Sequence, residues 1–548
     1  MKSSLLPLQM HQIMVYEIAA LFFAFLAGLW SLSYLFSPLR SKKNGSLGLP
    51  PGPVGLPLLG HLHMLGDLPH HSLHKLAMKY GPIVFIRLGL VPAVVVSSPE
   101  WAESILKTHD SVFASRPKIQ AAECMSYGQK NLVFAEYGPY WRNIRKLCTI
   151  ELLSSSKVEL FRPMRREELV NFVETIKIAA KSRSVIDVSS KVESLIEDMS
   201  YRMIFGLKDD KFNLRSCLQQ AVSITGAFNL ADFIPYLRHL IFKKYLYIFI
   251  NLEQYVRSIL NCGNGGPCLH MFEGFGRRMK AVNMVLDGFL EKIIDEHVQD
   301  AKELHGTHRD FIDVMLSLIE SNNTWELHLG RDHIKAIMVD MLAGTMDTSS
   351  TAIEWVIAEL LKNPRAMKLV QEELQIVVGL DRIVEEADLI KLDYLKMVIK
   401  ESMRLHPVAP LLVPHESIED ITIKGYFIPK SSRVLINTWA IGRDPNVWSS
   451  NAEEFFPERF IGTNIDFQGR DFRFLPFGSG RRKCPGMQLG STVVELVLAQ
   501  LVHCFNLELP GGMSPNDLEM TEKFGLTLPR ANHLFAVPTY RLRVNFGA

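Results

Sequence analysis

Cys484 lies in a segment whose composition suits a metal-binding thiolate. The ten residues that end at Gly486 read FGSGRRKCPG, so three cations precede the thiol and Pro-Gly follows it. An apolar, helix-like segment, MQLGSTVVELVLAQLVHCF, comes next. Nearby cations and a helix N-terminus both favour the thiolate, which is the form that binds a metal. The alternative is a basic surface turn with an incidental cysteine.

Three further charged residues are candidates to stabilise this segment. Glu401 and Arg404 share one face of a helix predicted over residues 394–405, which His406-Pro407 would end. Arg459 comes later, in a PERF segment. If Arg459 also met Glu401, the three charges would form a buried, multidentate network. Taken alone, a pair such as Glu401 and Arg404 is an ordinary surface pair worth a few tenths of a kcal/mol.

The longest predicted helix runs from Asp332, its expected N-cap, to Asn363, just before Pro364. Its middle, residues 343–349, reads AGTMDTS and contains poor helix formers in a row. Glycine and hydroxyl side chains there predict a kink, although a merely weak helix centre would have the same composition. A local distortion in a long apolar helix is a common place for chemistry.

The composition limits what kind of protein this is. The chain has 548 residues, of which 47% are hydrophobic, so it can bury a large core. A net charge of +2 without a long run of one sign gives no support for nucleic-acid binding. Seven cysteines at irregular spacings do not predict a secreted disulfide framework. Residues 80–98 predict short strands, helical patterns dominate residues 99–400, and no internal repeat is found.

The N-terminal region predicts a membrane anchor on a stiff neck. Residues 18–36 carry no charge and would span about 28 Å as a helix, close to the thickness of a hydrocarbon core. Arg40, Lys42 and Lys43 come next and place the remainder in the cytosol, whereas a cleaved signal peptide would end in small residues. The proline-rich residues 49–60 predict an extended connector. We therefore expect three parts: an anchor over residues 1–40, a neck over 41–60 and a body over 61–548.

Taken together and in order, these motifs resemble those of the cytochrome P-450 haem-thiolate monooxygenases, in particular the microsomal plant type. FGSGRRKCPG matches the family's FxxGxRxCxG loop, Glu401–Arg404 matches ExxR, and WRNIR at 141–145 matches WxxxR. The resemblance covers residues 15–545. It implies a mainly α fold with small β-sheets, in which haem b lies between a long kinked distal helix and a proximal helix after the cysteine loop.

By this resemblance, Cys484 would be the axial thiolate of the haem iron, a ligand that favours O–O cleavage. Gly480 and Gly486 would let the backbone approach the porphyrin and the sulfur. Phe477 would pack beside the thiolate and limit water. The network of Glu401, Arg404 and Arg459 would hold the cysteine loop in place, which is a folding role.

The same resemblance implies which residues lie near the haem propionates. Arg482, Arg145 and Trp141 would hold a propionate. His415 stands where many relatives have an arginine that faces a propionate. A histidine can donate one hydrogen bond there, with a charge that depends on pH.

On the opposite face of the haem, Asp347 and Thr348 fit the family's acid–alcohol pair, which relays protons during oxygen activation. Thr345 replaces a glycine of that pattern and would narrow or reshape the oxygen groove. A back-bonding hydroxyl is the alternative for Thr348. The segments expected to face substrate are poor in charge, which predicts a lipophilic small molecule; they are 113–133, 229–233, 408–415 and 524–527.

Residues 239–275 do not resemble the family. A retained intron or faulty gene model and a real loop that touches the membrane are both compatible with the segment, which begins HLIFKKYLYIFI. A metal site from Cys262, Cys268 and His270 is a third alternative, although three ligands at this spacing match no zinc signature.

The resemblance implies a single-pass protein of the endoplasmic reticulum membrane with a cytosolic catalytic domain. It would insert one atom of O2 into a lipophilic plant metabolite or xenobiotic, with electrons from NADPH through NADPH-cytochrome P-450 reductase. Four cations near the expected proximal face would attract that reductase; they are Arg142, Lys146, Arg481 and Lys483. The alternatives are a reductase-independent isomerase or dehydratase, and a non-catalytic haem protein disabled by the insertion.

Overall fold

The computed structural model describes residue 28 and residues 48–206, 214–226, 229–234, 274–303, 310–320 and 329–543. The predicted anchor, apart from Gly28, and nearly all of the atypical segment 239–275 lie outside the described residues. Among the described residues, one helix is long and apolar enough to cross a membrane, namely Met487–Cys504. Since 67% of it is buried inside the protein, it is a core helix of the fold.

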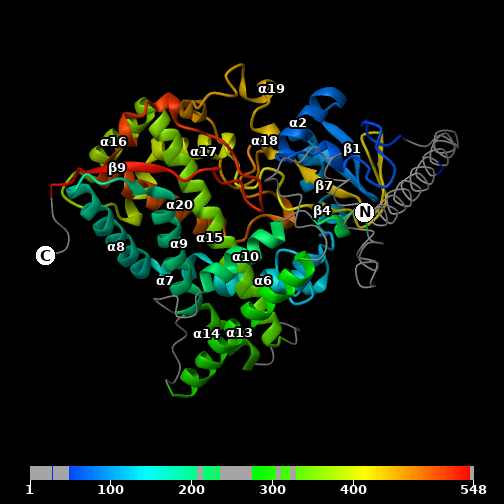
Figure 1. Ribbon diagram of the computed structural model, residues 1–548, viewed down its shortest axis with the longest axis horizontal. Coiled ribbons are helices and arrows are strands. Elements are labelled where there is room, and N and C mark those ends of the chain that lie inside the picture. The colour runs from blue at the N-terminus through cyan, green and yellow to red at the C-terminus, as the bar shows by residue number, and fades with distance from the viewer. Residues whose placement is uncertain are drawn as a thin grey trace, which may run out of the picture.

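Helices form most of the described chain, and strands lie toward both ends of the molecule (Figure 1). The first half contains α2 (Pro69–Tyr80), α3 (Pro99–Glu103), α4 (Asp110–Phe113), α5 (Gln120–Met125), α6 (Pro139–Leu147), α7 (Ser155–Leu160), α8 (Arg162–Lys181), α9 (Val188–Phe205) and α10 (Leu214–Gly226). The second half contains α13 (Gly274–Glu303), α14 (Phe311–Glu320), α15 (Arg331–Lys362), α16 (Pro364–Val378), α17 (Asp393–Leu405), α18 (Thr438–Ile441), α19 (Pro445–Trp448) and α20 (Met487–Cys504).

Three small sheets complete the fold. The largest has the strand order β1-β2-β7-β4, with β1 (Ile83–Leu88) antiparallel to β2 (Val91–Val96), β7 (Arg433–Ile436) parallel to β2, and β4 (His415–Glu416) at the edge. The second joins β3 (Ile186–Asp187), β9 (Phe535–Tyr540) and β8 (Phe505–Glu508), and the third is the hairpin β5 (Ile421–Ile423) and β6 (Tyr426–Ile428). The strands predicted within residues 80–98 are therefore present.

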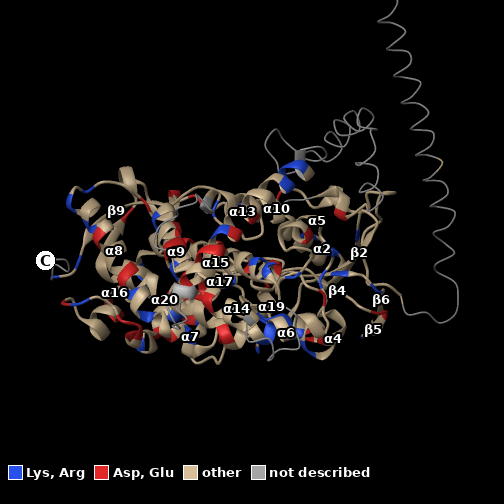
Figure 2. Cartoon of the chain, turned by 90° about the horizontal axis from the view of Figure 1, so that it is seen from below, with Lys and Arg blue, Asp and Glu red and all other residues tan. Residues whose placement is uncertain are grey.

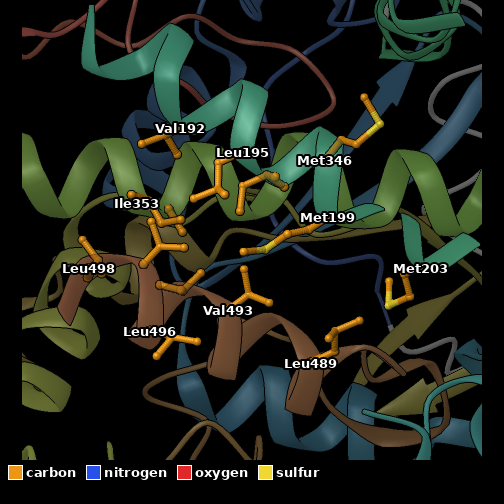
Figure 3. Close-up of a cluster of buried hydrophobic side chains, with 14 of the residues drawn as sticks. Val192, Leu195, Met199, Met203, Met346, Ile353, Leu489, Val493, Leu496 and Leu498 are labelled. Carbon is orange, nitrogen blue, oxygen red and sulfur yellow. The ribbon is translucent and has the colours of Figure 1, made fainter. Parts of the chain in front are cut away.

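Helix α15 runs through the centre of the helical part and packs most extensively against α9, with α20 on another side. Figure 3 shows apolar side chains from these three helices meeting, among them Leu195 of α9, Ile353 of α15 and Leu498 of α20. This packing buries almost every residue of α15 after Ser349. The central helix is therefore fixed from several sides, which is what a site on it needs.

Helix α15 differs from the prediction at its start. Its N-cap is Gly330, and Asp332 lies in the first turn, where it accepts from Lys130 Nζ at 2.8 Å. The carboxylate is thus drawn to a cation from another segment. At the other end the helix stops at Lys362 before Pro364, as predicted.

The proline-rich neck does not stand away from the body. Phe85 N of β1 donates to Pro51 O at 2.9 Å, and His61 Nε2 lies 2.9 Å from Pro53 O. A side chain at Gly52 would place its Cβ 2.0 Å from Phe85 O, so glycine is required for this approach. The neck is therefore docked along the edge of the large sheet, although Val54 stays 97% exposed.

Candidate haem site

Two adjoining cavities lie beside neighbouring facets of α15. The larger, of about 680 Å³, is lined on this helix by Ala343, Met346, Asp347 and Ser350; we call it the outer cavity. The smaller, of about 320 Å³, is lined by Gly344, Thr345 and Thr348 of α15 and by Cys484; we call it the thiol cavity. Both are walled by Ala409, Leu412 and Val413. Figure 3 shows Met199 and Val493, two residues of the thiol cavity, between the helices.

The cysteine loop is shaped by its glycines and closed by its own backbone. Gly478 and Gly480 have φ values of 67° and 68°, a region that favours glycine. A Cβ at Gly480 would lie 2.3 Å from Leu106 O, so this glycine serves close backbone packing inside the protein. Cys484 N donates to Phe477 O at 2.9 Å. At Gly486, φ is negative and an added Cβ would meet no atom within 4 Å.

The thiol of Cys484 differs from the sequence expectation in its electrostatics. Burial raises its pKa, and this effect outweighs the opposing effects of a Gly486 backbone hydrogen bond, Arg145 and Lys483. Lys483 Nζ donates to Gln468 Oε1 at 2.9 Å, and Arg481 pairs with Asp110 at 2.8 Å. The loop cations are therefore largely directed elsewhere, so a bound metal would have to supply the stabilisation of the thiolate.

Besides Arg165, which pairs with Glu386 at 2.8 Å, three guanidinium groups line the thiol cavity. Arg482 donates to Ala114 O at 2.6 Å, Leu132 O at 3.2 Å and Ala135 O at 2.5 Å, and its guanidinium lies 4.2 Å from the ring centroid of Trp141. Arg116 donates to the carbonyls of Val413 (2.5 Å), Pro414 (2.8 Å) and Val133 (3.2 Å). Arg145 also lines this cavity, and its guanidinium has no hydrogen-bond acceptor among the described residues.

These cations lack an acidic partner. Within the described ranges, none of Arg116, Arg145 and Arg482 forms an ion pair with a carboxylate. Burial lowers the pKa of each of them, and that of Arg482, which Arg145 lowers further, falls to about 9. Buried charges are normally paired, so this guanidinium cluster suits an anion.

Two other expected residues lie beside the cluster. Trp141 is buried and donates from Nε1 to Leu132 O at 3.0 Å. His415 has Nδ1 2.8 Å from Phe113 O, and burial, with Arg116 second, lowers its pKa well below the ordinary value. This direction favours the neutral imidazole of His415.

Glu401, Arg404 and Arg459 form a buried network. Glu401 accepts from Arg404 Nε and Nη2 at 2.7 and 2.8 Å and from Arg459 Nε at 2.8 Å. Arg404 also donates to Gly442 O and Ala452 O, and Arg459 donates to Trp448 O. The charges therefore fix the segment between residues 442 and 459.

This network reaches the cysteine loop indirectly. Aromatic rings pack in sequence from Phe460 to Phe474 (5.8 Å between centroids), then to Phe467 (5.9 Å) and to Phe477 (5.9 Å). Phe477 is the residue whose carbonyl accepts from Cys484 N. The stabilising role expected from the sequence would thus act through packed rings.

The distal residues separate onto two facets of α15. Asp347 faces the outer cavity and accepts from Thr527 Oγ1, while Thr348 faces the thiol cavity and donates to Gly344 O at 2.6 Å. Thr345 donates to Met341 O at 2.8 Å and accepts from Ser200 Oγ of α9 at 2.9 Å. The helix is continuous through this segment. The Thr345 and Thr348 hydroxyls donate to backbone carbonyls four residues earlier, a pattern that often bends helices.

The outer cavity includes residues from every segment expected to face substrate, but it is not poor in charge. Its apolar wall includes Ile119, Leu230, Leu411 and Phe524. Five carboxylates also line it, together with two cations; the acids are Asp67, Glu193, Glu197, Asp232 and Asp347, and the cations are Arg433 and Lys523. Asp232 belongs to one of the segments considered, whereas Glu193 and Glu197 come from α9, outside them.

Comparisons with known proteins assign the family. The cytochrome P450 family model matches residues 50–536. A ginseng protein, cytochrome P450 CYP736A12 of Panax ginseng, is 54% identical over 94% of this chain and 98% of its own length. The 4-hydroxyphenylacetaldehyde oxime monooxygenase of Sorghum bicolor is 39% identical over 93% of each chain. A zebra fish cytochrome P450 structure has a TM-score of 0.68 at 25% identity, covering 86% of this chain and 100% of that one.

The chain therefore belongs to the cytochrome P450 family. The observed site fits the haem that this family implies. A buried, acid-free guanidinium cluster suits two propionates, and a cavity with Cys484 in its wall suits an iron that takes a thiolate ligand. Gly344 adds room above, because a Cβ there would meet no atom within 4 Å.

Sequence reasoning missed two residues of this site. Arg116 is a lone arginine in the apolar stretch SVFASRPKIQ, and that isolation is the only local signal for it. Asp340 also lines the thiol cavity, one helical turn before Gly344 on the same face of α15. A carboxylate among MVDML could have been noticed as a polar residue on an apolar helix.

Proposed function

We propose that this protein is a membrane-anchored, haem-thiolate monooxygenase that inserts one atom of O2 into a lipophilic small molecule of plant specialised metabolism or a xenobiotic. Electrons come from NADPH through NADPH-cytochrome P-450 reductase, at the endoplasmic reticulum membrane. The observation that carries the proposal is the thiol cavity, where Cys484 faces α15 beside an unneutralised guanidinium cluster.

Each residue of the site has a role in this proposal. Cys484 binds the iron, and the bound haem supplies the activation of dioxygen. Arg116, Arg145 and Arg482 hold the propionates, with Trp141 stacked on Arg482. Phe477 and the apolar wall of the cavity keep water away from the sulfur.

The distal residues would handle protons and space. Burial raises the pKa of Asp347, against the lowering effect of its Thr527 hydrogen bond, so the group is disposed to take up and release a proton near the cavity junction. Thr348 holds a hydroxyl in the thiol cavity. The outer cavity receives the substrate, and its volume of about 680 Å³ suits a ligand of drug size.

The reductase would dock on the face that carries the cysteine loop. Arg142 and Lys146 are exposed on α6, and Arg481 is exposed on the loop. Figure 2 shows blue segments beside the label of α6. Lys483 is half-buried and bonded to Gln468, so it contributes less. Charge reversal of Arg142 and Lys146 should slow reduction and weaken its dependence on salt.

Reconstitution in lipid vesicles tests the proposal. The purified protein is mixed with a plant reductase, NADPH and a panel of lipophilic compounds, and oxygenated product is measured with and without the reductase. Product that requires both reductase and NADPH supports the monooxygenase. Turnover of a lipid hydroperoxide without NADPH would favour an isomerase or dehydratase, and reduction of the haem without any product would favour a haem protein disabled by its insertion.

A further inference from the structure

Asp340 of α15 binds a short segment that also supports the guanidinium cluster. Asn131 Nδ2 donates to Asp340 Oδ1 at 2.6 Å, and the backbone amides of Leu132 and Val133 donate to Oδ2 at 2.6 and 3.0 Å. The Asn131 side chain also accepts from Phe134 N at 3.2 Å. One carboxylate thus fixes the amide side of residues 131–135, which we call the strap.

The carbonyl side of the strap is held by the groups that would bind the cofactor. Leu132 O accepts from Arg482 and from Trp141, and Val133 O accepts from Arg116. Ala135 O accepts from Arg482 at 2.5 Å. Asp340 and the guanidiniums therefore grip opposite edges of the same backbone, so a shift at one edge must move the other.

The strap also walls both cavities. Leu132 and Val133 line the thiol cavity, and Phe134 lines the outer cavity. The strap is buried at Asn131, which is 3% exposed, so it has little freedom to adjust around a lost contact. A change at Asp340 would thus reach the substrate wall as well as the guanidiniums.

We propose that Asp340 is a positioning residue that sets the register of the strap against α15, and thereby the placement of Arg116 and Arg482 and the wall between the cavities, in a pH-dependent manner. The inference about the guanidiniums rests on the proposed haem function. The grip on the strap itself does not.

The surroundings of Asp340 make its charge sensitive to pH. All three of its donors are neutral groups. Burial raises its pKa to about 7, although the three hydrogen bonds act in the opposite direction. Tyr140 of α6 and Cys148 of the helical segment Cys148–Leu152 face it and are themselves neutral, because burial raises their pKa values. Lys130, the residue just before the strap, is paired with Asp332. A proton taken up near neutral pH would remove acceptor capacity from the strap.

Hydrogen exchange of the holoprotein tests this directly. Protection of the Leu132 and Val133 amides, corrected for intrinsic exchange, should fall by roughly tenfold between about pH 8 and pH 6. D340N should remove this pH dependence and speed haem loss to apomyoglobin. D332N is a matched control on the same helix and frees Lys130. It should leave the pH dependence of amide protection and the rate of haem loss unchanged.

If D340N does not fold, the wild-type pH series and N131A decide, because N131A keeps the two backbone donors of Asp340 and removes only the Asn131 side chain, which also accepts from Phe134 N. Protection that is independent of pH in the wild type would overturn the proposal, as would unchanged haem loss in the Asp340 variant. Exchange needs no turnover. A protein with pH-dependent strap protection but no thiolate-type spectrum would refute the haem function while leaving the grip of Asp340 on the strap intact.

Discussion

Asp347 and Thr348 are adjacent in sequence but line different cavities, since Asp347 bonds to Thr527 and Thr348 bonds back to Gly344. No hydrogen bond joins their side chains, although both residues belong to the described part of α15. If they act as an acid–alcohol pair, they do so across the junction of the two cavities. Replacing Asp347 and replacing Thr348 should therefore have different effects on product formation and NADPH consumption.

D347N should lower product formation about 100-fold, because it removes the buried acid while keeping an acceptor for Thr527. T348V should lower product formation less. It should instead increase the NADPH consumed without product, because the thiol cavity loses its hydroxyl. Product and NADPH consumption measured together in the reconstituted system distinguish the two effects. Equal losses with unchanged coupling in both variants would show that the separation has no functional meaning.

Arg145 should contribute to haem binding and not to the stability of the apoprotein. Its guanidinium lacks an acceptor among the described residues, and burial lowers its pKa, so R145M should leave the apoprotein as stable as before or slightly more stable. Loss of one charge-assisted hydrogen bond should speed haem dissociation roughly 10- to 100-fold. R142M, an exposed position on the same helix, is the control. Equal haem loss from both variants would remove Arg145 from the site.

E401Q should destabilise the protein by about 3–5 kcal/mol, because it leaves two buried guanidiniums without their shared carboxylate. E453Q breaks the pair of Glu453 with Arg443 in the same region, where Glu453 is 71% exposed, and should cost under about 1 kcal/mol. Urea unfolding followed by tryptophan fluorescence compares them. A small effect of E401Q would mean that the backbone carbonyls alone hold both arginines.

His297 should make stability fall at alkaline pH. Burial lowers its pKa, but Asp310, 3.1 Å away, outweighs this and raises the pKa to about 9. The raised value means that the stabilisation is fully present below about pH 6.5 and is lost as the pH rises through about 9. Urea unfolding of the wild type and H297Q across this range should converge at high pH. Parallel curves would contradict the assignment.

The sequence was sufficient to predict elements whose signals are local. The cysteine loop, the strands near residues 80–98 and the end of α15 before Pro364 follow from glycine, β-branched residues and proline close by. The meeting of Arg459 with Glu401 was expected from the family motifs, and the distance of 2.8 Å agrees. The family and its fold were likewise predicted correctly.

Other features depend on packing between distant segments, which local patterns do not contain. The raised pKa of Cys484 comes from burial, which outweighs cations that look close in sequence. Arg116 reaches the site because the chain returns at Val413, almost 300 residues later, to accept its hydrogen bonds. Gly330 replaces Asp332 as the N-cap because Lys130, from another segment, draws the carboxylate away.

The carbon-monoxide difference spectrum of the reduced protein tests the central claim most directly. The wild type should show the red-shifted Soret band of a thiolate-ligated haem, and C484H, which offers an imidazole instead, should bind haem without that band. A version lacking residues 239–274 would show whether that segment affects the site. Haem bound in the wild type without the red-shifted band, or the same band in C484H, would contradict the assignment of Cys484 as the iron ligand and the proposed function with it.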